Sequence, residues 1–168
     1  MPAIPVSGVS DEALSLKVLL DGVLQHIVDR FDYHNVPLPT KRYWKFGAPV
    51  VDCEQLVLSV VQSYIGLPGQ PASEPMRSNS PRSVVFRAVL VRCLPEPDSR
   101  GNEPAASKQQ EYANISAVDA WTLLDAVAHL DTWDSLDAFG LGVMATVDIE
   151  DPQGGFQPVI ATFTMAIP

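Results

Sequence analysis

The region that most constrains the fold is the second half of the chain, residues 115–168, where a helical pattern gives way to two strand patterns. Ser116 to Asp119 approximates a capping box, and the helix predicted from it runs from Ser116 to Leu130. Two alternating apolar runs follow at 142–149 and 156–167, and the turn-forming residues Glu150 to Gly155 separate them. The pattern therefore predicts a helix beside a β-hairpin.

The predicted second helix carries an apolar stripe, and we expect this stripe to face the core. We expect the helix to break at 132–135 and to add one further turn before Gly140 and Gly142. Trp121 and Trp133 are interpreted as core residues. The stripe consists of Val118, Trp121, Leu123, Leu124, Val127 and Ala128. In the hairpin, one predicted face holds Val143, Ala145, Val147 and Ile149, and a face of the last strand holds Val159, Ala161, Phe163, Met165 and Ile167.

A first helix is predicted near the N-terminus. Ser10 is a plausible N-cap, and Pro37 prevents the helix from continuing much beyond Phe31 to Tyr33. Its apolar residues recur at helical spacing and form one stripe, while the residues between them are mostly polar. The stripe is Leu16, Leu20, Val23, Leu24, Ile27 and Phe31.

Two further strands are predicted between the helices. Leu56 to Ile65 is rich in β-branched residues and favours a strand, although a helix is an open alternative for such a run. Val84 to Leu94 is expected to pair antiparallel with it. Long polar loops at 66–82 and 94–113 follow these strands, and we expect them to contact neighbouring subunits.

Together these elements predict an α+β two-layer sandwich in the order α-β-β-α-β-β. Two packed helices would cover a mainly antiparallel sheet of at least four strands. The length of 168 residues suits a single domain, 1–168, with residues 1–9 as an N-terminal arm.

The net charge of −9, from 11 basic and 20 acidic residues, argues against tight binding to nucleic acid phosphates. No apolar stretch is long enough to span a bilayer, and the first residues lack the pattern of a secretory signal. We therefore expect a cytoplasmic protein.

Residues that could carry catalysis or bind a metal are few. His26, His34 and His129 lack metal-ligand spacing, so we expect no metal and no cofactor. Cys53 and Cys93 sit beside predicted strands and could be neighbours across a sheet, but we interpret them as two buried thiols. Four carboxylates crowd the end of the second helix, where a solvated face is favoured over an anchor for a basic partner. They are Asp125, Asp131, Asp134 and Asp137.

Val51 to Leu56, with its Asp52-Cys53 pair, superficially resembles the cysteine motif of the NlpC/P60 cell-wall peptidases. That resemblance implies a cysteine hydrolase in which Cys53 opens a helix that activates the thiol. Glu54 and Gln55 replace the Ser-Gly that the family has after its cysteine. The downstream His129 lies within a predicted helix, whereas the family places its general base on a strand. We expect no enzyme.

Residues 40–52 form a basic, aromatic exception in an acidic chain. Core or interface packing ranks first as an explanation, contact with a partner second and nucleic acid third. The candidate partner contacts are Lys41, Arg42, Tyr43, Trp44, Lys45, Arg77, Arg82 and Arg100.

The chain resembles the tail terminator proteins of long-tailed actinobacteriophages. The residues that carry the likeness are Val51 to Val57, the strand Val84 to Cys93 with the following Leu94-Pro95, the helix segment Asp119 to Ala126, and the terminal hairpin with its Gly-Gly turn. The likeness covers most of the chain from about residue 10.

The resemblance implies a non-enzymatic virion protein of the neck, made in the host cytoplasm. Such proteins form a hexameric ring that caps the tail tube and joins it to the head–tail connector. DNA would pass through the acidic bore without specific binding. Another neck or tail component, namely a head–tail stopper or the tail tube protein, is the alternative within this class. No membrane partner is expected.

Overall fold

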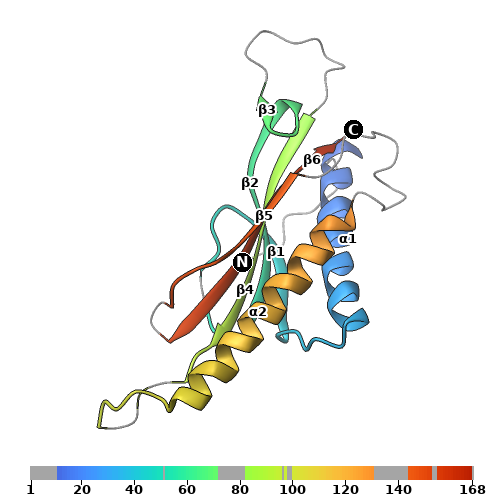
Figure 1. The fold of residues 1–168 in the computed structure, drawn as a ribbon. Coiled ribbons are helices and arrows are strands. Elements are labelled where there is room, and N and C mark those ends of the chain that lie inside the picture. The colour runs from blue at the N-terminus through green and yellow to red at the C-terminus, as the bar shows by residue number, and fades with distance from the viewer. Residues whose placement is uncertain are drawn as a thin grey trace, which may run out of the picture.

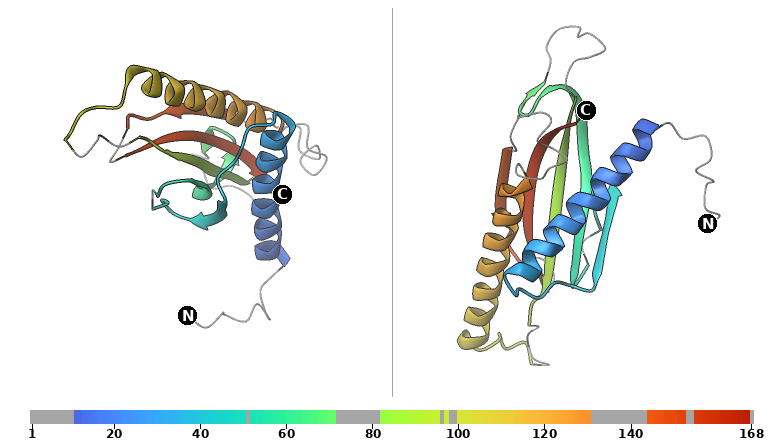
Figure 2. Two further views of the ribbon diagram at one scale, coloured as in Figure 1. Left: turned by 90° about the horizontal axis from the view of Figure 1, so that it is seen from below. Right: turned by 90° about the vertical axis from the view of Figure 1, so that its right-hand side faces the viewer.

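The computed structural model describes residues 11–50, 52–71, 82–95, 97, 100–130, 144–152 and 155–167. The fold is α+β, as the sequence predicts: two helices lie on one face of a mostly antiparallel sheet (Figure 1; Figure 2). Five strands run in the order β1-β2-β4-β6-β5, and the two-residue β3 pairs with the end of β2. The elements are α1 (Asp11–Tyr33), β1 (Lys41–Phe46), β2 (Gln55–Leu67), β3 (Gln70–Pro71), β4 (Arg82–Cys93), α2 (Ala106–Ala128), β5 (Met144–Ile149) and β6 (Phe156–Ile167).

The centre of the sheet is a long antiparallel ladder. β4 pairs with β6 from Arg82 opposite Ile167 to Cys93 opposite Phe156, and with β2 from Gln55 opposite Val91. The predicted strands and their antiparallel pairing are confirmed. A β-bulge interrupts the register of β2 between Val60 and Gln62.

The core lies between the sheet and the two helices. Alternate residues of β2, β4 and β6 face the helices because successive side chains of a strand point to opposite faces. The largest fully buried side chains include the stacked pair Phe86 and Phe163, whose ring centroids are 5.3 Å apart. Val159, Ala161, Phe163 and Met165 are buried on one face, as predicted.

The first helix matches its prediction. α1 ends at Tyr33, and its stripe residues Leu20, Val23, Ile27 and Phe31 have no exposed surface. The proposed N-cap, Ser10, lies outside the described residues.

The second helix corrects the prediction in two respects. α2 begins at Ala106 rather than Ser116, because residues 106–115, part of the predicted loop, are mostly good helix formers. Ser116 is therefore not a cap. It is buried within the helix and donates a hydrogen bond to Gln157 Oε1 at 2.8 Å.

The predicted apolar stripe of α2 is wrong for four of its six members. Val118, Trp121 and Leu124 are 47%, 57% and 46% exposed, whereas Leu123 and Val127 are buried as expected, and Ala128 is exposed. The core placement of Trp121 is thus incorrect. Trp133, the predicted break at 132–135 and the turn before Gly142 lie outside the described residues.

The basic, aromatic segment forms an edge strand. β1 pairs with β2 in parallel, from Lys41 opposite Gln55 to Phe46 opposite Val60. A parallel neighbour requires the chain to return past the sheet before β2 begins. Figure 2 (left) shows the segment after β1 on the side of the sheet away from α2. This placement explains why Val57, Val89 and Val91, which face away from the helices, are also buried.

Candidate functional site: a groove above a buried ion pair

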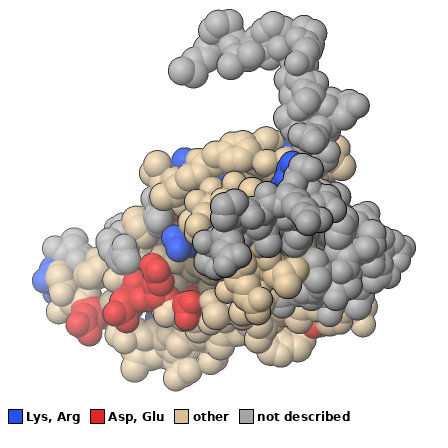
Figure 3. All heavy atoms as spheres, turned by 90° about the horizontal axis from the view of Figure 1, so that it is seen from above, with Lys and Arg blue, Asp and Glu red and all other residues tan. Residues whose placement is uncertain are grey.

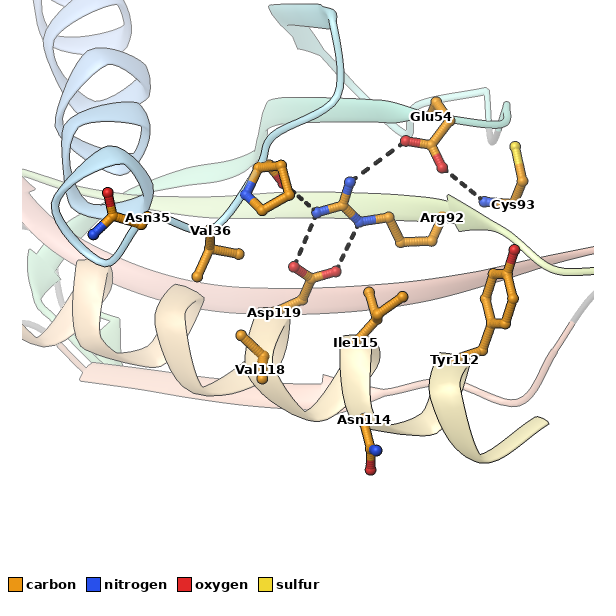
Figure 4. A pocket seen from close by; sticks show the side chains of 11 residues that line it. Asn35, Val36, Glu54, Arg92, Cys93, Tyr112, Asn114, Ile115, Val118 and Asp119 are labelled. Atoms are coloured by element: carbon orange, nitrogen blue, oxygen red, sulfur yellow. Dashed lines mark hydrogen bonds and ion pairs between the residues drawn. The ribbon is translucent and has the colours of Figure 1, made fainter. Parts of the chain in front are cut away.

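A groove with a volume of about 470 Å³ runs between α2 and the segment that follows α1 (Figure 4). Val36 and Pro37 form one side, and Ile115 and Val118 of α2 form the other. Ile115 and Val118 are 38% and 47% exposed. The walls are therefore apolar and open to solvent.

The floor of the groove is Arg92, near the end of β4. Its Nε donates to Asp119 Oδ2 at 2.8 Å, and its Nη2 donates to Asp119 Oδ1 at 3.0 Å, which makes a two-point ion pair. Nη2 also donates to the carbonyl of Pro37 at 2.6 Å, and Nη1 to Glu54 Oε2 at 3.4 Å. Arg92 thus joins the α1–β1 connection, β2 and α2 at one point.

Burial shapes the electrostatics of this ion pair. The side chain of Arg92 is 12% exposed and that of Asp119 is 1% exposed. Burial disfavours the charged guanidinium, but the hydrogen bonds that it donates to Asp119, together with the negative charge of that carboxylate, outweigh burial and raise the pKa of Arg92 above its ordinary value. Since Asp119, Glu54 and Pro37 occupy its donors, Arg92 acts as a structural link.

A disulfide closes one end of the groove and corrects the prediction of two free thiols. Cys53 and Cys93 are bonded, with their Cα atoms 5.1 Å apart. They meet because they continue the β2–β4 ladder beyond the Gln55–Val91 pair. Between them and Arg92, Glu54 adopts a φ of +53° and accepts a hydrogen bond from the Cys93 N–H at 3.2 Å.

The disulfide also bears on the alternative of a cysteine hydrolase, because that enzyme would use Cys53 as a free thiol. The chain after Cys53 enters the strand β2, not the helix that the NlpC/P60 resemblance implies. His129 lies at the C-terminal end of α2, where its Nδ1 is 2.8 Å from the Asp125 carbonyl oxygen. The NlpC/P60 arrangement needs a thiol at the start of a helix and a histidine on a strand, and Cys53 and His129 do not form it.

A second polar cluster joins the C-terminal ends of the two helices. Asp125 of α2 accepts hydrogen bonds from the guanidinium of Arg30 and lies 2.9 Å from His34 Nε2. Burial opposes ionisation of Asp125, but the bonds from Arg30 and His34 outweigh it and lower its pKa. Asp125 is 16% exposed, so the predicted solvated face is wrong for this residue. Asp131, Asp134 and Asp137 lie outside the described residues.

Aromatic packing extends this cluster to the exposed surface. The rings of His34 and Trp121 meet edge to face, with centroids 4.8 Å apart. Trp121 nevertheless remains 57% exposed. Together with Ile115, Val118 and Leu124 it forms what we call the outer face of α2.

The predicted basic contacts do not form one cluster. Lys41 pairs with Asp52 at 2.5 Å, Tyr43 donates to Gln55 at 3.3 Å, and Trp44 donates to Asp21 of α1 at 2.6 Å. Arg82 and Arg100 are exposed, but Arg82 begins β4 and Arg100 follows its other end. Arg77 lies outside the described residues. The segment 41–45 therefore combines packing on the protein with a basic edge on which Arg42 is exposed and Lys45 is half-buried.

Figure 3 shows a group of acidic side chains on the face viewed from above, with basic side chains in smaller, scattered patches. Within the described ranges, no group of three or more His, Cys, Asp or Glu residues could hold a metal ion, and no helix is long and apolar enough to cross a membrane.

The buried ion pair and the outer face of α2 are the features that sequence reasoning missed. The buried ion pair has one signal in the sequence, which is a charged residue that directly follows an apolar one. Arg92 follows Val91 in this way, and Asp119 follows Val118. Comparison with protein-family models and with curated protein sequences finds no match for this chain.

Proposed function

We propose that this protein is a non-enzymatic structural subunit of a long-tailed phage, most specifically a tail terminator. It would assemble as a ring at the head–tail junction, cap the tail tube and join it to the head connector or stopper. The family assignment rests on the sequence resemblance at Val51 to Val57, at the strand ending in Cys93 and at Asp119 to Ala126. The surface of the molecule supports the mode of action, which is assembly through contact.

The outer face of α2 is the observation that carries this proposal. From Tyr112 to Leu124, every exposed side chain of the helix is uncharged, and Asp119 is turned inward. Large exposed residues in this stretch are Ile115, Val118, Trp121 and Leu124. A contiguous apolar surface of this kind marks a protein–protein contact, since leaving it in water is unfavourable.

The charge of the chain suits a ring through which DNA passes. A net charge of −9 repels the phosphates of the duplex, so a bore lined by this protein would let DNA slide without adhering. The structural roles of Arg92 and of the bonded Cys53 and Cys93 agree with a protein that acts through shape.

Measuring the mass of the purified protein over a range of concentrations tests the proposal. We expect a closed assembly of one stoichiometry, with a central opening visible by electron microscopy. A protein that remains monomeric at all concentrations would contradict the proposal. Assembly into long tubes would instead favour the tail tube protein, and hydrolytic activity that depends on Cys53 would favour the enzyme.

Two variants locate the contact. Val118→Asp introduces a charge into the outer face of α2 and should weaken assembly, because the contact would bury that charge. Val18→Asp is the matched control: Val18 is 68% exposed on α1, outside the proposed contact. Equal assembly by both variants would remove the outer face of α2 from the proposal.

A further inference from the structure

The two strands that end the sheet are similar in length and open along their outer edges. β1 and β5 each have six residues and terminate the strand order at opposite sides (Figure 2, right). Most of their residues are exposed, including Phe46 at 58%, Met144 at 58% and Ile149 at 48%. In the described part of the chain, no strand pairs with their outer sides. An open edge offers unpaired backbone N–H and C=O groups to another strand.

The two edges carry opposite charges. β1 holds Lys41, Arg42 and Lys45, while Asp148 lies on β5 and Glu150 and Asp151 follow it. Arg42, Lys45 and Asp148 are without ion pairs among the described residues. In a chain of net charge −9, one basic edge facing one acidic edge is the arrangement that brings copies together against their overall repulsion.

The strand directions also match. β1 runs parallel to β2, and each of the next three pairings, β2–β4, β4–β6 and β6–β5, reverses direction. β1 and β5 of one molecule therefore run in opposite directions. If a second copy is placed beside the first by rotation about an axis along the strands, its β1 meets β5 in the antiparallel sense, which favours pairing.

We propose that copies of this protein associate edge to edge, with β1 of one copy adding to β5 of the next as an antiparallel strand. The inference rests on the proposed ring and adds an edge-to-edge contact between its subunits to the contact proposed for the outer face of α2. Such a contact joins two different surfaces, so it leaves one open edge at each end and closes only when a ring is complete. Main-chain hydrogen bonds would supply affinity and the charges would supply register.

The faces of the sheet restrict that register. Lys41, Tyr43 and Lys45 share the face of β2 that points away from the helices, and Asp148 shares the corresponding face of β6. If each face of the sheet continues across the contact, two registers are possible. In the first, Lys41 lies opposite Asp148. In the second, Tyr43 lies opposite Asp148 and Lys41 lies opposite Glu150. Either register brings basic and acidic side chains within the reach of cross-strand pairs.

Charge reversal on the two edges tests the proposal. One variant, Asp148→Lys with Glu150→Lys, makes both edges basic. The other, Arg42→Glu with Lys45→Glu, makes both edges acidic and spares the Lys41–Asp52 ion pair. Each variant alone should self-associate roughly tenfold or more weakly than the unaltered protein, because the two edges that approach each other then carry net charge of the same sign.

An equimolar mixture of the two variants gives the decisive measurement. Each contact in an alternating arrangement then joins a basic edge to an acidic edge, so assembly should return and both variants should be present in the product, as read by native mass spectrometry. Asp29→Lys with Asp32→Lys is the control, since it makes the same change in net charge on exposed residues of α1. This control should assemble like the unaltered protein.

The outcomes separate this inference from the proposed function. If the unaltered protein never assembles, the ring itself fails. If the unaltered protein assembles and the two edge variants do so equally well, the ring stands and the β1–β5 contact is overturned. The same result would show that the basic residues of β1 serve only to keep its edge from aggregating.

Discussion

The two helices pack on the same face of one sheet, yet they divide polar and apolar residues in opposite ways. α1 buries Leu20, Val23, Ile27 and Phe31 completely and exposes mainly polar residues. The side of α2 that faces the sheet includes Ser116, Asp119 and Thr122, all buried, whereas Val118, Trp121 and Leu124 are exposed. α1 is an ordinary amphipathic helix, whereas part of α2 buries polar side chains and exposes apolar ones.

This difference shows that a partner, more than polarity, decides whether a side chain is buried. Asp119 is buried because Arg92 donates two hydrogen bonds to it, and Ser116 is buried because its hydroxyl donates a hydrogen bond to Gln157. The inner side of α2 thus combines these polar residues with the buried Leu123 and Val127, while further apolar residues lie on its outer face. A helix with two apolar surfaces is suited to two neighbours, one within the fold and one outside it.

The largest expected effect tests the inward polar side of α2. Asp119→Ala leaves the guanidinium of Arg92 buried without its main counter-charge, and we expect a loss of about 3–5 kcal/mol in the free energy of unfolding. Urea denaturation measures it. Asp29→Ala on the exposed side of α1 is the control and should cost no more than about 0.5 kcal/mol.

A loss below about 1 kcal/mol for Asp119→Ala would mean that Arg92 reaches water and that the ion pair is not a core feature. The double variant Arg92→Leu with Asp119→Leu adds a second check. It should cost less than the single variant, because no unpaired charge remains.

Two adjacent leucines of α2 sharpen the comparison further. Leu123 is fully buried and Leu124 is 46% exposed. Leu123→Ala should cost about 2–5 kcal/mol of unfolding free energy, as Ile27→Ala should on α1, because each leaves a cavity. Leu124→Ala should leave the stability of the monomer within about 0.5 kcal/mol and weaken assembly instead.

Thermal unfolding in dilute solution and mass measurements in concentrated solution separate these two effects. The comparison between the helices would break if Leu124→Ala destabilised the isolated monomer as strongly as Leu123→Ala does.

The smallest expected effect concerns the junction of the two helices. Because Arg30 and His34 lower the pKa of Asp125 in the folded protein, its ionised form stabilises the fold at neutral pH. This contribution is complete above the pKa of the unfolded group, about pH 4, and disappears as the pH falls through the lower folded value.

Asp125→Asn should therefore cost about 1.5–3 kcal/mol at pH 7 and reduce the loss of stability in acid. Denaturation curves between neutral and acidic pH measure both. Asp29→Asn on α1 serves as the control. Identical acid dependence in the Asp125→Asn variant and the unaltered protein would contradict the role of this carboxylate.

Local patterns in the sequence predict most of the fold. The stripe of α1, the antiparallel pairing of the strand after Leu56 with the strand after Val84, and the final hairpin all depend on neighbours in sequence. Each was predictable because its apolar residues recur with the period of one element.

The missed ion pair and the missed disulfide both join residues that are distant in sequence. The local pattern places Asp119 at a helix start and gives no sign of its partner Arg92, which is 27 residues away. The disulfide likewise joins cysteines separated by 40 residues. The beginning of α2 was missed because residues 106–115 are polar helix formers without an apolar stripe. The candidate site lies where these long-range contacts meet, so little of it could be predicted.

The bulge between Val60 and Gln62 has a consequence for tolerance to deletions. It adds one residue to β2, so the alternation of side chains on either side of it is out of phase. Residues 55–59 are buried and residues 61–63 are exposed within one continuous strand. Deleting Val61 would remove the bulge and leave Gln62 opposite Val85, Ser63 opposite Val84 and Tyr64 opposite Ser83, so each side chain would keep its partner and its side of the sheet. We therefore expect β2 to tolerate the loss of one codon at this point better than at any paired position, where a deletion would turn the following side chains to the other face.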